Sequence, residues 1–215
     1  MAEPRFIVLE GVEGSGKSTQ IRLLGAWLES LGLDYVRARE PGGTRVGESI
    51  RNVLLHDDGG EIPAETELLL MLAARAAFVR EVVRPALEAG RTVLADRFDF
   101  STFAYQGHGR GLPLDQVREL NRFATGGLVP DLVVVLDLPP ELGRERQARE
   151  GKTLDRIERA GEEFMERVLE GYRSLAVSEG HARMIDGRGT PEEVHARLRA
   201  LLESRFPETF RPAPV

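Results

Sequence analysis

The segment GVEGSGKS, residues 11–18, constrains this 215-residue chain more than any other feature because it matches the pattern G-x-x-x-x-G-K-[ST]. It follows the apolar run Phe6 to Leu9, which predicts a buried strand, and it precedes a helical pattern that begins near Ser18. Glycines let such a loop curl so that its N–H groups converge on phosphate oxygens, and the following helix adds a positive dipole. The segment therefore predicts a phosphate-binding loop.

The loop residues have expected roles in binding ATP. Lys17 is expected to bridge the β- and γ-phosphates, and Ser18 to offer its hydroxyl to Mg²⁺. Lys17 and Lys152 are the only lysines among 29 basic residues, so a lysine at position 17 indicates a compact charge that a planar guanidinium replaces poorly. The predicted ATP-binding residues are Gly11, Val12, Glu13, Gly14, Ser15, Gly16, Lys17, Ser18 and Thr19.

Four further apolar runs, at 35–38, 92–95, 132–138 and 183–185, predict buried strands, and segments of helical period lie between them. This alternation favours a parallel sheet covered by helices on both faces, because helices supply the crossovers that parallel strands need. We expect one domain over residues 1–205 and a loose tail over 206–215, where prolines accumulate. The arginine-rich stretch at 144–159 is either a mobile insertion or a solvated helix.

Composition excludes several classes of protein. The chain has 41% hydrophobic and 30% charged residues and no apolar run near the ~20 residues of a membrane helix, so a soluble protein is expected. The absence of cysteine excludes disulfides, thiolate metal sites and a cysteine nucleophile. The start MAEPRFIVLEG does not read as a signal peptide, which favours the cytoplasm. A net charge of -6 argues against a nucleic-acid binder.

Three constellations after the loop indicate a nucleotide acceptor. Asp96 and Arg97 close the third strand, where an acid can steer Mg²⁺ and an arginine can face a phosphate. The segment at 40–44 follows the second strand, with Arg51 on the next helix. The segment at 101–107 offers hydroxyl, amide and aromatic groups suited to a base and a sugar. Each is weak alone, but their joint order after a phosphate loop is a strong signal.

A GTPase switch is not favoured by the remaining sequence. The guanine-reading pattern N-K-x-D is absent from the chain. The segment Asp57 to Gly60 formally matches D-x-x-G, but it follows a predicted helix rather than a strand, and a polar turn is the better interpretation.

The chain resembles the thymidylate kinase family, from FIVLEGVEGSGKSTQ through REPGGT, AAR, DRF, STFAYQG and PDLVVVLDLPPELGRER to LDRIE. The resemblance implies a three-layer α/β/α fold of the P-loop NTP hydrolase type, with a five-stranded parallel sheet and a small helical lid at about 144–159. It also implies transfer of the γ-phosphoryl group of ATP to dTMP, giving dTDP and ADP for dTTP synthesis, with Mg²⁺ and in a cytoplasmic homodimer.

The resemblance also implies roles in acceptor binding. Glu13 lies near the sugar 3′-hydroxyl, Arg51 and Arg97 bind the acceptor phosphate, and Arg75 bonds the thymine carbonyl. The remaining acceptor residues are Thr102 and Gln106 at the base edge, Tyr105 beneath the sugar, and Met71, which stands where members often stack an aromatic ring and is expected to pack its thioether on thymine.

The phosphate loop carries Gly14 where some members carry an arginine, and members with glycine there carry their basic groups in the lid. The candidates in this chain are Arg149, Lys152 and Arg156, of which Arg149 is the first choice as an arginine finger. The predicted catalytic residues are therefore Lys17, Arg97 and Arg149, and the predicted metal-binding residues are Ser18 and Asp96.

Two other functions stay open from the sequence. One is a kinase for another nucleoside monophosphate, and the other, from a different class, is a regulatory module whose ATP occupancy signals to a partner. The expected partners are ATP and dTMP, with neither nucleic acid nor a membrane.

Overall fold

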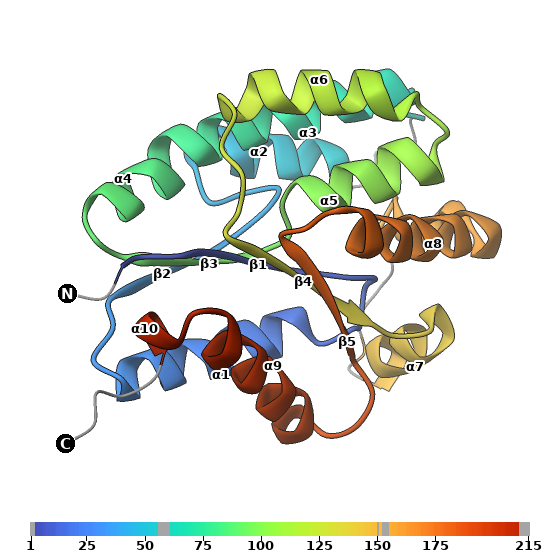
Figure 1. Cartoon of the computed structure of the whole chain (residues 1–215). Coiled ribbons are helices and arrows are strands. Elements are labelled where there is room, and N and C mark those ends of the chain that lie inside the picture. The colour runs from blue at the N-terminus through green and yellow to red at the C-terminus, as the bar shows by residue number, and fades with distance from the viewer. Residues whose placement is uncertain (1–2, 56–60, 150, 152–154, 211–215) are drawn as a thin grey trace.

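A computed structural model describes residues 3–55, 61–149, 151 and 155–210 of the chain. Its centre is a parallel sheet of five strands in the order β2-β3-β1-β4-β5 (Figure 1). The strands are β1 (Phe6–Glu10), β2 (Tyr35–Arg39), β3 (Thr92–Asp96), β4 (Leu132–Asp137) and β5 (Ala182–Asp186). The prediction of a five-stranded parallel sheet is confirmed.

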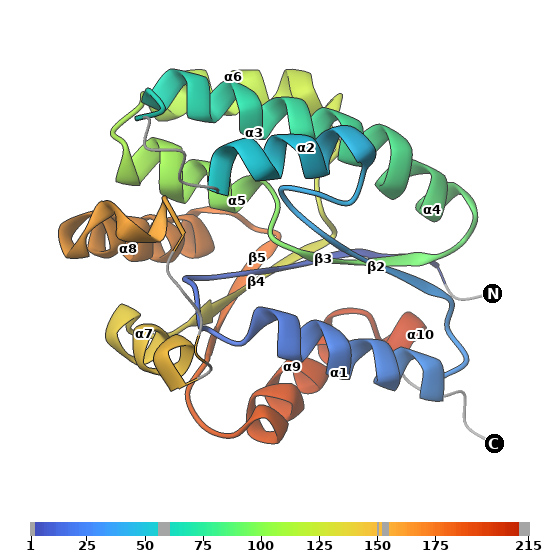
Figure 2. The same ribbon diagram turned by 180° about the vertical axis from the view of Figure 1, so that it is seen from behind.

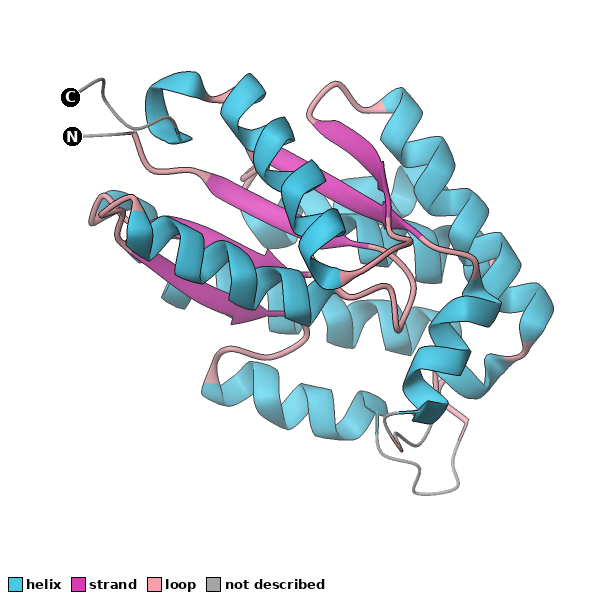
Figure 3. Cartoon of the chain, turned by 90° about the horizontal axis from the view of Figure 1, so that it is seen from below, coloured by secondary structure: helices cyan, strands magenta, loops and turns pink. Residues whose placement is uncertain are grey.

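Helices cover both faces of this sheet, which gives three layers (Figures 1 and 2). One face carries α1 (Lys17–Ser30), α9 (Pro191–Arg205) and α10 (Pro207–Phe210), with α7 (Pro140–Arg149) at its end. Figure 3 shows the sheet from the side of α1 and α9. The other face carries α2 (Arg45–Leu55), α3 (Ala64–Phe78), the π-helical η1 (Val79–Val83), α4 (Arg84–Glu88), α5 (Asp99–Thr102), the π-helical η2 (Phe103–Gly109), α6 (Leu114–Thr125) and α8 (Glu162–Ser178).

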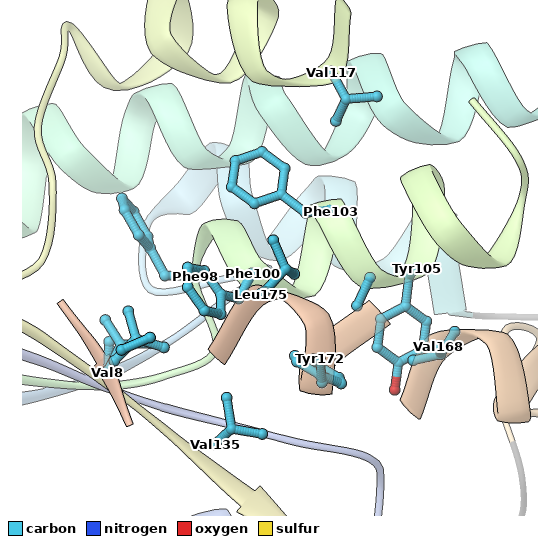
Figure 4. Close-up of a cluster of buried hydrophobic side chains, with 14 of the residues drawn as sticks. Val8, Phe98, Phe100, Phe103, Tyr105, Val117, Val135, Val168, Tyr172 and Leu175 are labelled. Atoms are coloured by element: carbon cyan, nitrogen blue, oxygen red, sulfur yellow. The ribbon is translucent and has the colours of Figure 1, made fainter. Parts of the chain in front are cut away.

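The sheet is apolar on both faces because each central strand feeds two cores. In β1, Phe6 and Val8 pack into the cluster under α3, α6 and α8, whereas Ile7 and Leu9 pack into the cluster with α1 and α9. Figure 4 shows part of the first cluster, in which Val8 lies below the phenylalanines that follow β3. Full burial of each such side chain contributes about 1.5–3 kcal/mol, so β1 is held firmly at the centre of the fold.

The carboxyl ends of the parallel strands all reach one edge of the sheet. The phosphate loop follows β1, and Glu40 and Arg97 follow β2 and β3, whose ends are joined by a bond from the Glu40 N–H to the Asp96 carbonyl. The chain then passes over β1 to form β4 on its other side. Ligands of open α/β sheets bind at such a reversal of strand order, which places the predicted residues at the expected edge.

The C-terminal segment corrects one expectation. Residues 206–210, expected in a loose tail, contain α10, and both Phe206 and Phe210 are buried in the cluster that includes Trp27. Their apolar side chains outweigh the signal of Pro207, which begins α10. In the arginine-rich stretch, 144–149 forms the end of α7, and η3 (Glu158–Ala160) is a 3₁₀ turn. Lys152 and the segment at 57–60 lie outside the described residues.

No helix in the described part of the chain is both long enough and apolar enough to cross a membrane.

Candidate active site

The phosphate loop wraps tightly around the amino group of Lys17. Gly11, Gly14 and Gly16 have positive φ angles of 135°, 72° and 98°, which side chains rarely adopt. Lys17 Nζ is buried and donates to the carbonyls of Gly11 at 3.1 Å and Val12 at 2.9 Å. Burial lowers the pKa of Lys17, and the nearby Arg97 guanidinium lowers it further. An anionic phosphate beside this amine would offset both effects.

Close backbone packing explains the glycine at position 14. A Cβ atom built on Gly14 would lie 2.3 Å from the carbonyl oxygen of Gly143 in α7, so the loop and the helix touch through two glycines. A side chain at position 14 would force this contact apart. An arginine at position 14 would therefore be incompatible with the present position of α7.

A pocket of about 850 Å³ opens over the phosphate loop. We call it the donor pocket because the loop is expected to bind ATP, the donor of the phosphoryl group. Glu13 through Gln20 line one wall, and the turn after β5 lines another through Gly187, Gly189 and Thr190. The turn after β5 is therefore part of the same pocket as the phosphate loop. Gly11 and Val12 do not line the pocket; their carbonyls hold Lys17 instead.

Arg146 is a donor-pocket residue that sequence reasoning missed. It lies on α7, and its guanidinium donates to the carbonyls of Gly14 at 3.4 Å and Gly187 at 3.3 Å, so it spans the pocket from the phosphate loop to the β5 turn. The surrounding arginines gave no pattern that distinguished it. Only the contact between α7 and the loop shows its position.

Ser18 and Asp96, the two residues predicted to bind the metal, lie in contact with each other. Ser18 Oγ donates to Asp96 Oδ2 at 2.7 Å at the carboxyl ends of β1 and β3. A hydroxyl and one carboxylate fit Mg²⁺, which takes few protein ligands and completes its shell with phosphate oxygens and water. The described residues contain no cluster of three or more His, Cys, Asp or Glu side chains that could hold a metal ion.

A second pocket, of about 650 Å³, lies beyond the loop between β2, β3 and the helical layer of α3 and α5. We call it the acceptor pocket because it holds the residues expected to bind the nucleotide that accepts the phosphoryl group. It meets the donor pocket at Glu13, which lines both. The structure brings together in this pocket all eight residues predicted to bind the acceptor: Glu13, Arg51, Met71, Arg75, Arg97, Thr102, Tyr105 and Gln106.

Arg97 sits at the junction of the two pockets in a strained backbone. Its φ of 72° is the one positive value of a non-glycine residue in the described ranges, and such a conformation costs about 1–3 kcal/mol. The guanidinium donates to Glu13 Oε2 at 2.7 Å and to the Tyr172 hydroxyl at 3.1 Å, and it lies 5.3 Å from the centre of the Tyr105 ring. The chain reverses after β3 to point this group back over the loop.

Four hydrogen bonds hold the guanidinium of Arg75 at the base of the acceptor pocket. Its guanidinium donates to Glu40 Oε2 at 2.8 Å, to Thr102 Oγ1 and Asn121 Oδ1 at 2.9 Å each, and to the Phe98 carbonyl at 2.7 Å. These bonds occupy four of the five N–H groups of an arginine. Within the described residues, one N–H group of Arg75 is left for a ligand.

Two buried carboxylates, Glu40 and Asp99, lie near this arginine, and no signal in the sequence indicated Asp99. Burial raises the pKa of Glu40 to about 7, although Arg75 opposes the shift. Burial likewise raises the pKa of Asp99 to about 6. The negative charge near Arg75 is thus weaker at neutral pH than the count of carboxylates suggests.

Of the candidates for the arginine finger, Arg149 and Arg156 lie away from the phosphate loop. Arg149 lines neither pocket; its side chain is 77% exposed and pairs with Glu145 one turn earlier in α7. Arg156 pairs with the buried Glu67 instead. In this conformation the side chain of Arg149 faces solvent, whereas Arg146, one turn earlier, lines the pocket; the role of Arg149 as a finger stays a prediction.

A phosphate loop with a donor pocket, joined through Glu13 to an arginine-lined acceptor pocket, defines a P-loop nucleotide kinase. The sequence model of the family described as "Thymidylate kinase" matches residues 9–198. The thymidylate kinase of Pelotomaculum thermopropionicum is 52% identical over 192 residues, 89% of each chain, and that of a Synechococcus strain is 48% identical over 203 residues, 94% of this chain and 96% of the relative.

Solved structures agree with the sequence comparisons. The crystal structure of thymidylate kinase from Ehrlichia chaffeensis superposes with a TM-score of 0.76 at 29% identity, over 93% of this chain and 98% of that one. The chain belongs to the thymidylate kinase family and is an enzyme.

Proposed function

We propose that this enzyme transfers the γ-phosphoryl group of ATP to dTMP, giving dTDP and ADP for the synthesis of dTTP. The observation that carries the proposal is the meeting of the two pockets at Glu13, with Lys17 on the donor side and Arg97 on the acceptor side. Phosphoryl transfer requires mainly alignment and charge neutralisation, and both are available at that junction. Membership of the thymidylate kinase family supports dTMP as the acceptor.

The acceptor phosphate binds between Arg97 and Arg51. Arg51 lines the pocket opposite Arg97 and is oriented by a bond from its Nη1 to the Pro41 carbonyl at 3.0 Å. Two guanidinium groups offset the negative charge of a monophosphate as it approaches the γ-phosphoryl group. Tyr105 forms the floor beneath the sugar, and Glu13 receives the 3′-hydroxyl.

Ser18 and Asp96 hold the Mg²⁺ that accompanies ATP. When bound, the ion screens the negative charge of the phosphates. The 2.7 Å bond between the two side chains supports this assignment because it already places a hydroxyl and a carboxylate at the mouth of the loop.

A substrate panel tests the proposed acceptor. We expect a coupled assay of ADP formation to rank dTMP well above dUMP, UMP, CMP and AMP. A preference for a ribonucleotide would reassign the enzyme to another monophosphate, and slow turnover with every acceptor would favour a regulatory ATP-binding module.

The lid arginine stays a prediction that kinetics can test. Arg149→Ala is expected to lower kcat more than it raises the KM for dTMP, because a finger acts on the transferred group only. Arg146→Ala, the matched variant one turn earlier in α7, is expected to raise the KM for ATP, because Arg146 already lines the donor pocket. A normal kcat for Arg149→Ala would move the finger to Lys152 or Arg156.

The family resemblance further supports a homodimer. Five of the eight large apolar side chains that are exposed among the described residues lie on α2, α3 and α6, which pack side by side away from the sheet (Figure 2): Val46, Val53, Leu69, Leu120 and Phe123. A second copy would cover this face. Sedimentation should show a dimer that Leu69→Asp dissociates; an unchanged mass would place the interface elsewhere. Cytoplasmic location stays a prediction.

A further inference from the structure

The carboxylate of Glu67, on α3, is completely buried at the inner end of the acceptor pocket. Gln106 Nε2 donates to its Oε1 at 2.9 Å, Arg110 donates to both oxygens at 3.2 and 3.1 Å, and Arg156 donates to Oε2. Burial raises the pKa of Glu67, but the bonds from Arg110, Gln106 and Arg156 outweigh it and hold the pKa below its ordinary value. Glu67 is thus a charged acceptor with no proton to donate.

This charge state decides which way the amide of Gln106 points. A carboxylate only accepts hydrogen bonds, so the NH₂ group of the amide must face Glu67 and the carbonyl Oε1 must face away from it. Gln106 lines the acceptor pocket and is 1% exposed, and within the described residues no group donates to its Oε1. This oxygen is open to the pocket, so a ligand that carries a donor can hydrogen-bond to it.

We infer that Glu67 is a positioning residue for base selection: by accepting from Gln106 Nε2, it makes Gln106 present a hydrogen-bond acceptor to the base. The inference rests on the proposed function, in which Gln106 meets the base edge. Glu67 itself does not line the pocket and acts only through Gln106.

The hydrogen-bond acceptor Gln106 Oε1 distinguishes pyrimidine bases by whether N3 carries a proton. Thymine and uracil carry an N3–H donor, which Gln106 Oε1 can accept, whereas cytosine carries a lone pair on N3 that would face another lone pair. The free N–H of Arg75 makes the same distinction at the neighbouring position of the ring. It can donate to the carbonyl of thymine, but it would face the amino group of cytosine, which is also a donor. The pocket therefore rejects cytosine twice, and Glu67 controls one of the two rejections.

Arg156 adds a reason for the position of Glu67. Asp155 and Ile157, on either side of Arg156, both line the acceptor pocket, and Arg156 also donates to the Leu54 carbonyl at 2.9 Å. The carboxylate of Glu67 therefore binds both the amide of Gln106 and Arg156, whose neighbours in the sequence line the same pocket.

The test compares dTMP and dCMP in Glu67→Gln. A glutamine at position 67 can donate as well as accept, so the Gln106 amide is free to turn over and offer its NH₂ group to N3 of cytosine. We expect the ratio of kcat/KM for dTMP to that for dCMP to fall at least about tenfold. Glu67→Asp keeps an acceptor-only group and should preserve the ratio even if both activities fall. An unchanged ratio in Glu67→Gln would overturn the inference.

Arg110→Gln is the matched control because it removes another partner of Glu67 and leaves Gln106 in place. It should keep the ratio of kcat/KM for dTMP to that for dCMP. An equal loss of this ratio would show that general disturbance of the cluster, and not amide orientation, sets base preference.

If Glu67→Gln fails to fold, Gln106→Met provides the test. This variant removes the acceptor and should lower the ratio, whereas a wild-type ratio would refute the inference. Calorimetric affinities for dTMP and dCMP give the same ratio without turnover, so a wild-type enzyme that bound but failed to phosphorylate dTMP would count against the proposed function alone.

Discussion

Lys17→Ala is expected to abolish phosphoryl transfer while leaving the fold intact. Lys17 supplies an ammonium group at the floor of the donor pocket, and removal of a preorganised charge from a transition state costs roughly 10²–10³-fold or more in kcat. The fold should survive because the interactions lost are local to the loop: two hydrogen bonds to the carbonyls of Gly11 and Val12 and a 3.8 Å ion pair with Glu13. Steady-state kinetics with dTMP, together with thermal unfolding of the same preparation, measure both halves of this prediction.

Arg22→Ala provides the control for this result. Arg22 is an exposed cation on the same helix, α1, and it lines neither pocket, so its removal changes the net charge equally. Its kcat should stay near the wild-type value. Turnover of Lys17→Ala within about tenfold of wild type would contradict the assignment of the donor site, because no effect of that size fits loss of the phosphate-bridging charge.

Arg97→Ala is expected to reduce kcat/KM for dTMP by about 1000-fold, with a smaller effect on the KM for ATP. Arg97 faces the acceptor pocket and also orients Glu13 through their 2.7 Å ion pair, so the variant loses a phosphate contact and loosens the junction. Loss of one charged donor at a reacting phosphate corresponds to about 3–4 kcal/mol. Kinetics with each substrate varied in turn measure the split.

The strained backbone of Arg97 allows a second variant to separate function from stability. Both Arg97→Ala and Arg97→Gly remove the guanidinium, and they should lose the same activity. At a φ of 72°, however, glycine is unstrained, so Arg97→Gly should be more stable than Arg97→Ala by about 1 kcal/mol in denaturant unfolding. Equal stability of the two variants, or retained dTMP affinity in either, would show that this strain does not serve the acceptor site.

The parts of the site that the sequence predicted are those with local signals. The glycine spacing before Lys17 predicted the loop, the apolar runs predicted all five strands to within one residue at every end, and Arg97 followed from its place after β3. The acceptor residues came from resemblance to a family, and the structure gathers all of them in one pocket.

What the sequence did not predict depends on contacts between distant segments. Arg146 and Arg149 are equivalent in a sequence rich in arginine, and only the packing of Gly143 against Gly14 turns one of them to the donor pocket. Glu67 lies in no motif, yet three side chains from distant segments donate hydrogen bonds to it: Gln106, Arg110 and Arg156. Residues 206–210 differ from the expected loose tail because Phe206 and Phe210 are buried against the helices, although a proline stands at 207 and two more follow at 212 and 214.

Transfer of label tests the central claim most directly. ATP carrying a radioactive γ-phosphate, incubated with the enzyme, Mg²⁺ and unlabelled dTMP, should yield label in dTDP, and the rate should collapse in Lys17→Ala and Arg97→Ala. Label that appears only as free phosphate, or that reaches another nucleoside monophosphate in preference to dTMP, would contradict the account.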